Sequence, residues 1–325
     1  MWAQSNENLK VIKGEENVMM YLLLLVGFVL LVKGADFFVE GSSSIAKMLK
    51  IPSVVVGLTI VAMGTSAPEA AVSLTASLSG NNDIALSNVI GSNIFNLLVV
   101  IGACAALKGV DTPSDILKRD LPINIGITGL LLVLIWDCKI SRIEGLLLLL
   151  GIAVYLIVVV RQALKNRVEN DEEEIKVLSP LMSAVYIVGG LVAIVIGGDL
   201  VVDSASGIAT AFGLSQTLIG LTIVAMGTSL PELVTSIVAT KKGETGLALG
   251  NAVGSSIFNI LFILGLSGSV SPITGSVEAI MDTVILLGVT IVTYLFARSS
   301  EKTVPKEGIA CLLLYAGYMV FAIIR

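Results

Sequence analysis

The sequence predicts an all-α polytopic membrane protein with ten transmembrane helices in two inverted five-helix repeats. The first observation is composition: the 325 residues are 55% hydrophobic and only 14% charged. Soluble domains carry about 25% charged residues. The second observation is that apolar runs of about 20 residues, the length that spans a bilayer, recur along the whole chain. The third is an internal repeat, which predicts the inversion.

The apolar runs divide the chain into two halves and a linker. Residues 1–18 are polar, lack a signal-peptide pattern and are expected to form a solvated tail. Residues 19–160 and 181–325 are each expected to form one five-helix repeat. Residues 161–180, with an acidic run at 169–174, are expected to be a solvated cytoplasmic linker; a weak regulatory cation site is the alternative. The ten expected spans lie near 19–40, 53–79, 84–107, 121–137, 143–160, 181–202, 215–240, 245–268, 274–297 and 308–324.

Positive charge alternates between the two sides of the predicted membrane. Of the 20 Lys and Arg residues, 14 fall on the side of the linker, five fall on the opposite side, and Lys33 lies within the first span. Because positive charge is retained in the cytoplasm, the larger set is expected there. The sequence therefore predicts a multi-pass protein of the cell membrane with both termini extracellular.

The residues that are missing exclude several functions. The chain contains no histidine, which excludes imidazole metal ligands and Ser-His catalysis. Cys104, Cys138 and Cys311 have no metal-ligand spacing and are expected to be small apolar residues of helices. No nucleic-acid-binding patch is present. We therefore expect no enzyme, no cofactor and no obligatory protein partner, with the lipid bilayer as the surroundings.

An exact internal repeat is the strongest signal in the sequence. Residues 57–66 and 220–229 both read GLTIVAMGTS, at an offset of 163. The same offset relates Pro68 to Pro231, Glu69 to Glu232, and GSNIFN (91–96) to GSSIFN (254–259). Five predicted spans separate equivalent points, and because five is odd the halves cross the membrane in opposite senses. Transporters are commonly built this way, with the substrate at the midplane.

The repeated segment places a carboxylate and a proline inside the membrane. Glu69 and Glu232 lie well within their spans, where a charge costs about 3 kcal/mol or more and usually faces the protein interior. The preceding prolines break the helix, and carbonyls freed at this depth need protein, water or a cation. The prolines leave the carbonyls of Gly64 and Gly227 without helical partners, and a spreading break would also free those of Ala62, Thr65, Ala225 and Thr228.

A second polar segment in each half completes a set of oxygen ligands. The i, i+4, i+8 spacing puts each of two trios on one helix face: Asn88, Ser92 and Asn96, and Asn251, Ser255 and Asn259. For Asn88 and Asn251 the alternative is that they join helices by hydrogen bonds. An all-oxygen set suits Ca²⁺ and is poorly matched to Zn²⁺ or copper. Two carboxylates would be offset by one Ca²⁺ or by two or more Na⁺.

These elements, GTSAPE (64–69) and GTSLPE (227–232) with GSNIFN and GSSIFN, resemble the two α-repeats of prokaryotic members of the Na⁺/Ca²⁺ exchanger branch of the Ca²⁺/cation antiporters. The resemblance implies electrogenic exchange of Na⁺ for Ca²⁺ by alternating access. The proton-coupled branch typically has Asn in place of the Thr-Ser pair, so Na⁺ coupling is favoured. Ca²⁺/H⁺ exchange on the same scaffold is the alternative.

The resemblance also implies roles for individual residues. Glu69 and Glu232 would hold Ca²⁺ with the Thr65 and Thr228 carbonyls. The Na⁺ positions or the centre of the site would be lined by Ser66, Ser92, Asn96, Ser229, Ser255 and Asn259, with the carbonyls of Ala62 and Ala225. Spans one and six, which carry Asp36 and Asp199, would slide as the gate, and both aspartates are expected to be structural or entry-path residues.

One departure concerns Asn259, because K⁺-dependent members and some prokaryotic exchangers carry Asp there. The amide argues against K⁺ cotransport and lowers the negative charge of the site.

Two other classes of protein explain fewer of these sequence features. An intramembrane aspartyl protease, prompted by Asp36 and Asp199, leaves the duplicated glutamates unexplained, and a passive channel does not need an inverted repeat with broken helices.

Overall fold

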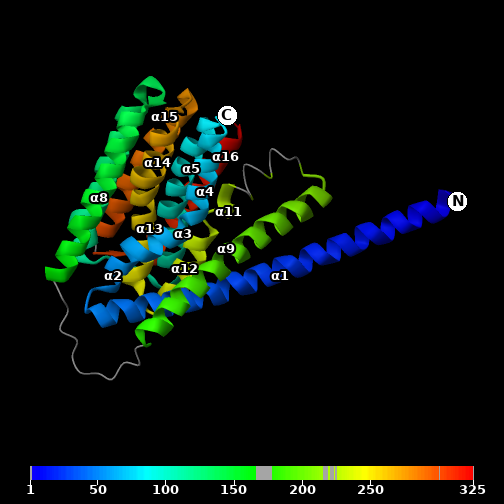
Figure 1. The fold of residues 1–325 in the computed structure, drawn as a ribbon, viewed down its shortest axis with the longest axis horizontal. Coiled ribbons are helices and arrows are strands. Elements are labelled where there is room, and N and C mark those ends of the chain that lie inside the picture. Colours follow the sequence, from blue (N-terminus) through cyan, green and yellow to red (C-terminus); the bar gives the residue numbers. More distant parts are fainter. Residues whose placement is uncertain are drawn as a thin grey trace.

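The computed structural model describes residues 2–165, 178–214, 219, 223, 225–299 and 301–324, and these are mostly helical (Figure 1). The elements of the first half are α1 (Trp2–Leu49), α2 (Ser53–Val56), η1 (Gly57–Val61), α3 (Ala62–Thr65), α4 (Ala67–Leu78), α5 (Asn82–Phe95), η2 (Asn96–Val100), α6 (Ile101–Lys108), β1 (Val110–Asp111), η3 (Ile116–Asp120), α7 (Leu121–Leu134), η4 (Ile135–Asp137), β2 (Lys139–Ile140) and α8 (Arg142–Lys165). Those of the second half are α9 (Pro180–Ala211), α11 (Ala225–Gly227), α12 (Leu230–Lys241), α13 (Thr245–Phe258), η6 (Asn259–Leu264), α14 (Gly265–Val270), β3 (Ile273–Thr274), α15 (Val277–Ser299), β4 (Lys302–Thr303) and α16 (Pro305–Ile324).

Eight helices in the described part of the chain are long and apolar enough to cross a membrane, as predicted for a polytopic membrane protein. A ninth candidate is the pair of segments Ser53–Thr65 and Ala67–Leu78, which bend by 47° at the break. The expected span 215–240 lies partly outside the described residues, so the tenth helix stays a prediction. The expected linker lies mostly outside them as well. The expected N-terminal tail continues α1 as helix from Trp2.

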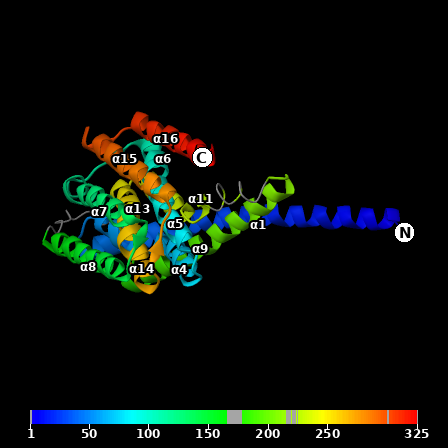
Figure 2. The ribbon, with the colours of Figure 1, turned by 90° about the horizontal axis from the view of Figure 1, so that it is seen from above.

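Two long helices, α1 and α9, lie side by side along one edge of the bundle (Figures 1 and 2). Glycines bring their backbones together: a Cβ atom at Gly34 would lie 2.8 Å from the carbonyl oxygen of Gly190. The N-terminal part of α1 projects beyond the other helices (Figure 1). The pair therefore packs backbone against backbone, with little room for side chains between the helices.

The centre of the bundle is formed by α13 and the segments packed on it. Every residue of α13 from Leu247 to Phe258 is buried. Close approach again depends on glycine, because a Cβ atom at Gly254 would lie 2.7 Å from the Cα atom of Leu58. This approach brings the polar face of α13 against η1 and α3, where the first repeated element lies.

Two short antiparallel ladders connect the two halves of the chain, an addition to the predicted all-α fold. Strand β1 pairs with β4, and β2 pairs with β3. Residues of β1 and β2 are related to those of β3 and β4 by the offset of 163, so the two ladders are equivalent under the repeat. The repeated pattern thus extends to connections that the helical motifs did not include.

Candidate cation-binding site

Two broken helices position the repeated glutamates at equivalent points. In the first half, α3 ends at Thr65, Ser66 lies at the junction, and Pro68 occupies the first turn of α4. Proline is tolerated there because its missing N–H has no partner in a first turn. Glu69 follows in the same turn, where the helix dipole favours a negative charge. In the second half, Glu232 occupies the same place in α12.

The two halves are joined at this point by reciprocal hydrogen bonds. The Ser66 hydroxyl donates to Oε1 of Glu232 at 2.9 Å, and the Ser229 hydroxyl donates to Oε1 of Glu69 at 2.8 Å. All four residues are fully buried. Each repeat therefore supplies the hydroxyl that binds the carboxylate of the other repeat. The two repeated elements therefore meet at one buried cluster of side chains.

The second oxygen of each glutamate has no partner. Oε2 of Glu69 and Oε2 of Glu232 are buried and accept no hydrogen bond. No lysine or arginine of the described residues forms an ion pair with either glutamate. Unpaired buried carboxylates are strongly unfavourable. The chemistry of the site therefore fits a bound cation.

Further oxygen donors surround the glutamates, and several are also buried without a partner. The Ser255 hydroxyl lies 3.4 Å from Oε1 of Glu232 and 3.4 Å from the carbonyl oxygen of Ala62. Buried polar atoms without a partner belong to Ser92, Asn96, Thr228 and Asn259. In the described part of the chain, no group of three or more His, Cys, Asp or Glu gathers into a metal site. The candidate ligands thus comprise two carboxylates among neutral oxygens.

Among the expected carbonyl ligands, that of Ala62 keeps a helical partner. The Ala62 carbonyl accepts the N–H of Ser66 at 3.1 Å, so the break does not free it, although Ser255 also reaches it. Ala225 begins α11, and its side chain lies outside the described residues. The Thr65 hydroxyl donates to Oδ1 of Asn251 at 3.0 Å.

Asn88 and Asn251 hold the broken helices rather than facing the site with the rest of their trios. Each amide nitrogen donates to the backbone carbonyl of the glutamate in its own half, at 3.3 Å in both halves. Each also donates to a serine one turn later, Ser73 at 2.9 Å and Ser236 at 3.0 Å. These contacts fit the alternative in which the two asparagines join helices.

Access to the site differs between the halves. Thr65 is fully buried, whereas the equivalent Thr228 lines a cavity of about 410 Å³ together with Pro68, Asp199 and Asp203. Both aspartates are exposed. The cavity therefore lies between α9 and both helix breaks, and the entry-path role of Asp199 stays a prediction.

The equivalent positions in the other half form a salt bridge. Lys242, at the end of α12, lies 2.6 Å from Oδ1 of Asp36 and 3.7 Å from Oε2 of Glu40. Lys242 Nζ also donates to the Asp36 carbonyl at 3.0 Å. Asp36 and Glu40 are the repeat equivalents of the two aspartates that line the cavity. Asp36 therefore has a structural role here, joining α1 to α12.

Asn96 and Asn259 each begin a short π-helical segment, η2 and η6. Such segments are rare and occur frequently at functional sites. Sequence reasoning missed a third asparagine, Asn93 on α5, which is fully buried and donates to the carbonyl of Ser256 at 3.1 Å. The signal that marks it is the one mismatch between GSNIFN and GSSIFN.

Both halves of the chain match a known protein family. The family model described as sodium/calcium exchanger protein matches residues 19–161 and 182–324. The chain belongs to this family. CaxA of Alkalimonas amylolytica is 41% identical over 308 residues, covering 91% of this chain and 96% of its own length. The sodium/calcium exchanger MaX1 of Methanosarcina acetivorans is 33% identical over 343 residues, covering 92% of this chain and 97% of its own.

Solved structures place the same fold among the exchangers. The sodium-calcium exchanger NCX_Mj, soaked with 2.5 mM Na⁺ and 0.1 mM Ca²⁺, superposes with a TM-score of 0.82 at 31% sequence identity. The match covers 95% of this chain and 98% of that one. The protein is therefore a helical membrane protein of a cation-antiporter family, and the family is one of transporters rather than enzymes.

Proposed function

We propose that the protein exchanges Na⁺ for Ca²⁺ across the cell membrane by alternating access. The observation that carries the proposal is the pair of reciprocal bonds, Ser66 to Glu232 and Ser229 to Glu69, which leave one buried carboxylate oxygen free in each half. In this proposal ten transmembrane helices form two inverted five-helix repeats, residues 19–160 and 181–325. Both termini are extracellular, as the distribution of Lys and Arg predicts.

The proposed ligands are those that the resemblance to the exchangers implies. Glu69 and Glu232 bind Ca²⁺ with the carbonyls of Thr65 and Thr228. The Na⁺ positions use the hydroxyls and amides around them and the two alanine carbonyls: Ser66, Ser92, Asn96, Ser229, Ser255, Asn259, Ala62 and Ala225. These are hard oxygen ligands, which suit both Ca²⁺ and Na⁺.

Charge balance explains why the two fluxes are coupled. One Ca²⁺ neutralises two carboxylates, and so do two Na⁺, whereas an empty site leaves both charges buried. The empty carrier therefore does not change sides easily, and each transported ion is exchanged for another. The resemblance to the exchangers further implies that more positive charge moves as Na⁺ than as Ca²⁺, which makes the exchange electrogenic.

The asymmetry of access is consistent with one state of the transport cycle. The cavity at Thr228 lies on the side of Asp199 and Asp203, and the Lys242 salt bridge lies on the other side. With the orientation predicted from positive charge, the cavity opens to the extracellular side. We therefore interpret the structure as an outward-facing state that is closed at the cytoplasmic end of α1.

A second candidate is Ca²⁺/H⁺ exchange on the same scaffold. It is favoured by the free Oε2 atoms of Glu69 and Glu232, which are positioned to take protons instead of Na⁺. Both candidates use the same carboxylates, so only the counter-ion separates them.

The test is Ca²⁺ flux in proteoliposomes that contain the full-length protein, driven by a Na⁺ gradient at clamped pH. We expect Ca²⁺ uptake that depends on internal Na⁺ and responds to an imposed membrane potential. Uptake driven by a pH gradient, with no dependence on Na⁺, would establish the proton-coupled alternative. Glu69→Gln and Glu232→Gln are each expected to abolish Ca²⁺ uptake, whichever gradient drives it. Full Ca²⁺ flux in either variant would contradict the proposal that both glutamates bind the cation.

A further inference from the structure

The geometry points to Asn93 as a positioning residue that fixes the side-chain amide of Asn259, so that the Asn259 oxygen is left for a cation. This inference rests on the proposed cation site. Asn93 lies on α5, outside the set of expected ligands, and it is fully buried. It reaches across to the segment where α13 meets η6, in the other half of the chain.

Two hydrogen bonds connect Asn93 to that segment. Its Nδ2 donates to the backbone carbonyl of Ser256 at 3.1 Å, and its Oδ1 accepts from Nδ2 of Asn259 at 3.1 Å. All three residues are fully buried. Water therefore does not compete for these groups, and each lost partner has a cost.

The order of donors and acceptors fixes both amides. A backbone carbonyl only accepts, so Asn93 presents its nitrogen to Ser256 and its oxygen to Asn259. Asn259 then presents its own nitrogen to Asn93. Its Oδ1 is directed elsewhere and is buried without a partner. Because Asn259 lies four positions after Ser255, which contacts Glu232, the residue lies on the helix face of the site.

The first half of the chain lacks this arrangement. The repeat equivalent of Asn93 is Ser256, whose hydroxyl donates to the Ala252 carbonyl of its own helix at 3.0 Å. The equivalent of Asn259 is Asn96, and both polar atoms of its side chain are without a partner. Thus the sequence mismatch at positions 93 and 256 fixes one amide of the site and leaves the other unrestrained.

The same contact selects an amide over a carboxylate at position 259. A carboxylate has no N–H to offer, so one of its oxygens would face Oδ1 of Asn93. If the Asn93 amide were rotated to present its nitrogen to the carboxylate, its oxygen would face the Ser256 carbonyl, and two acceptors would again lie opposite each other. A serine hydroxyl at position 93 can donate to either neighbour. Asn93 therefore keeps the charge of the site at two carboxylates.

The test is a double-mutant cycle with Asn93→Ser, Asn259→Asp and the combined variant, in purified full-length protein. Equilibrium binding of radiolabelled Ca²⁺ and of radiolabelled Na⁺ is measured, with the melting temperature in ion-free buffer. We expect Asn93→Ser to weaken Ca²⁺ binding about three- to tenfold, the effect of one buried hydrogen bond. Asn259→Asp is expected to weaken binding with Asn93 present and to strengthen it in the N93S background, although the added charge is the same.

Equal effects of Asn259→Asp in both backgrounds overturn the inference. So does an Asn93→Ser variant with a lower ion-free melting temperature but unchanged ion affinities, because that result indicates a purely structural role. The control is Asn124→Ser, the same change at a buried asparagine of α7, which is expected to leave both affinities unchanged. If wild type binds ions but shows no Na⁺-driven flux, the exchange proposal fails while the cycle still tests Asn93. If wild type binds neither ion, both proposals are wrong.

Discussion

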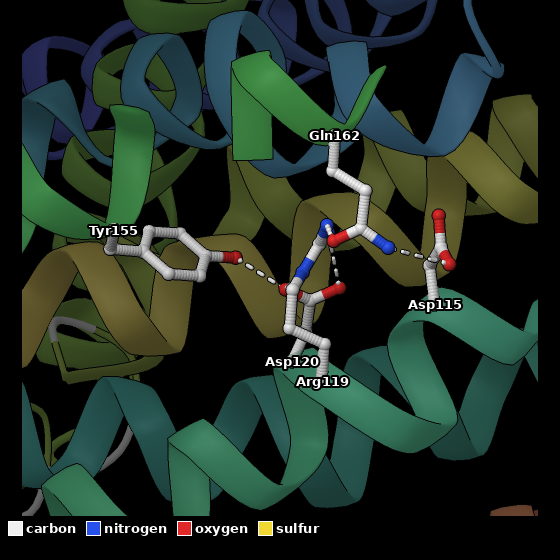
Figure 3. Close-up of polar contacts among 5 residues, drawn as sticks. All are labelled: Asp115, Arg119, Asp120, Tyr155 and Gln162. Atoms are coloured by element: carbon white, nitrogen blue, oxygen red, sulfur yellow. Dashed lines mark hydrogen bonds and ion pairs between the residues drawn. The ribbon is translucent and has the colours of Figure 1, made fainter. Parts of the chain in front are cut away.

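Two clusters of charge are buried among the helices, and they differ in how completely the charges are paired. Figure 3 shows the first, at the start of α7 and the end of α8. Arg119 forms two hydrogen bonds to Asp120, from Nε at 2.8 Å and from Nη2 at 2.9 Å, and a third from Nη1 to Gln162 at 2.7 Å. Tyr155 donates to Asp120 at 3.0 Å, and Gln162 donates to Asp115 at 3.1 Å.

The second cluster is the glutamate pair. Glu69 and Glu232 are as fully buried as Asp120. In the described residues, however, no lysine or arginine forms an ion pair with either glutamate. Each has one serine-bound oxygen and one free oxygen.

The difference in pairing distinguishes a buried charge that stabilises the fold from buried charges that are available to bind a transported cation. Asp120 has its counter-ion on the neighbouring residue, so the cluster is complete without any ligand and joins α7 to α8. The glutamates have hydrogen-bond support but no counter-charge. A permanent Lys or Arg partner would stabilise them and would also compete with the transported ion. Leaving them unpaired makes the stability of this region depend on bound cations.

The largest expected effect is on ion binding after removal of one glutamate charge. Glu69→Gln and Glu232→Gln should each weaken Ca²⁺ binding by at least about 100-fold, because Ca²⁺ affinity follows the charge of its ligands. The ion-free melting temperature should stay the same or rise, since an unpaired buried charge is removed. Calorimetry and thermal melting with and without Ca²⁺ measure both. A large fall in the ion-free melting temperature would mean that the carboxylates are paired by the protein.

The matched change in the paired cluster should have the opposite result. Asp120→Asn leaves the partly buried Arg119 without the carboxylate that pairs with it and should lower stability by about 2 kcal/mol. Transport per folded molecule should not change, because the cluster is separate from the candidate ligands. Denaturation of the detergent-solubilised variant measures the first quantity, and flux normalised to folded protein measures the second. Loss of normalised flux would show that the α7–α8 cluster takes part in transport.

Smaller effects are expected from the serines that cross between the halves. Ser66→Ala and Ser229→Ala each remove one hydrogen bond to a buried carboxylate, which should weaken Ca²⁺ binding about tenfold. Ser229→Ala should have the larger effect, because Oε1 of Glu232 keeps the Ser255 hydroxyl at 3.4 Å when Ser66 is removed. Ser77→Ala is the control, a buried serine of α4 whose hydroxyl has no partner. If only Ser66→Ala weakens binding, the Ser255 hydroxyl does not support Glu232 in the bound state.

The sequence was sufficient to predict the class, most spans and the burial of the glutamates, because hydrophobic length and an exact repeat are local signals. The repeat also indicated that Glu69 and Glu232 belong to one site. It did not predict that the serine of each half donates to the glutamate of the other half, because these hydrogen bonds depend on how the two halves pack. Asn88 fitted two interpretations by its spacing, and only its contact with the Glu69 carbonyl favours one of them.

The paired cluster illustrates what sequence reasoning lacks. Arg119 and Asp120 are adjacent and look like an ordinary charged helix end, and Tyr155 lies 35 positions away from Asp120 without any repeat to link them. Asn93 was overlooked for a related reason. Its role depends on a mismatch between the halves, whereas the motif analysis followed identities. In both cases the information lies in packing between distant segments.

The smallest expected effect sharpens the comparison from the side of the paired cluster. Tyr155→Phe removes one of the three hydrogen bonds that Asp120 accepts and should lower stability by about 1 kcal/mol. Because Arg119 still neutralises Asp120, the variant should keep wild-type flux and wild-type Ca²⁺ affinity. Tyr21→Phe, at an exposed position of α1, is the control and should change neither quantity. If Tyr155→Phe is as unstable as Asp120→Asn, the tyrosine hydroxyl rather than the arginine stabilises the buried carboxylate of Asp120. The two clusters would then differ in their hydrogen bonds and not in the pairing of their charges.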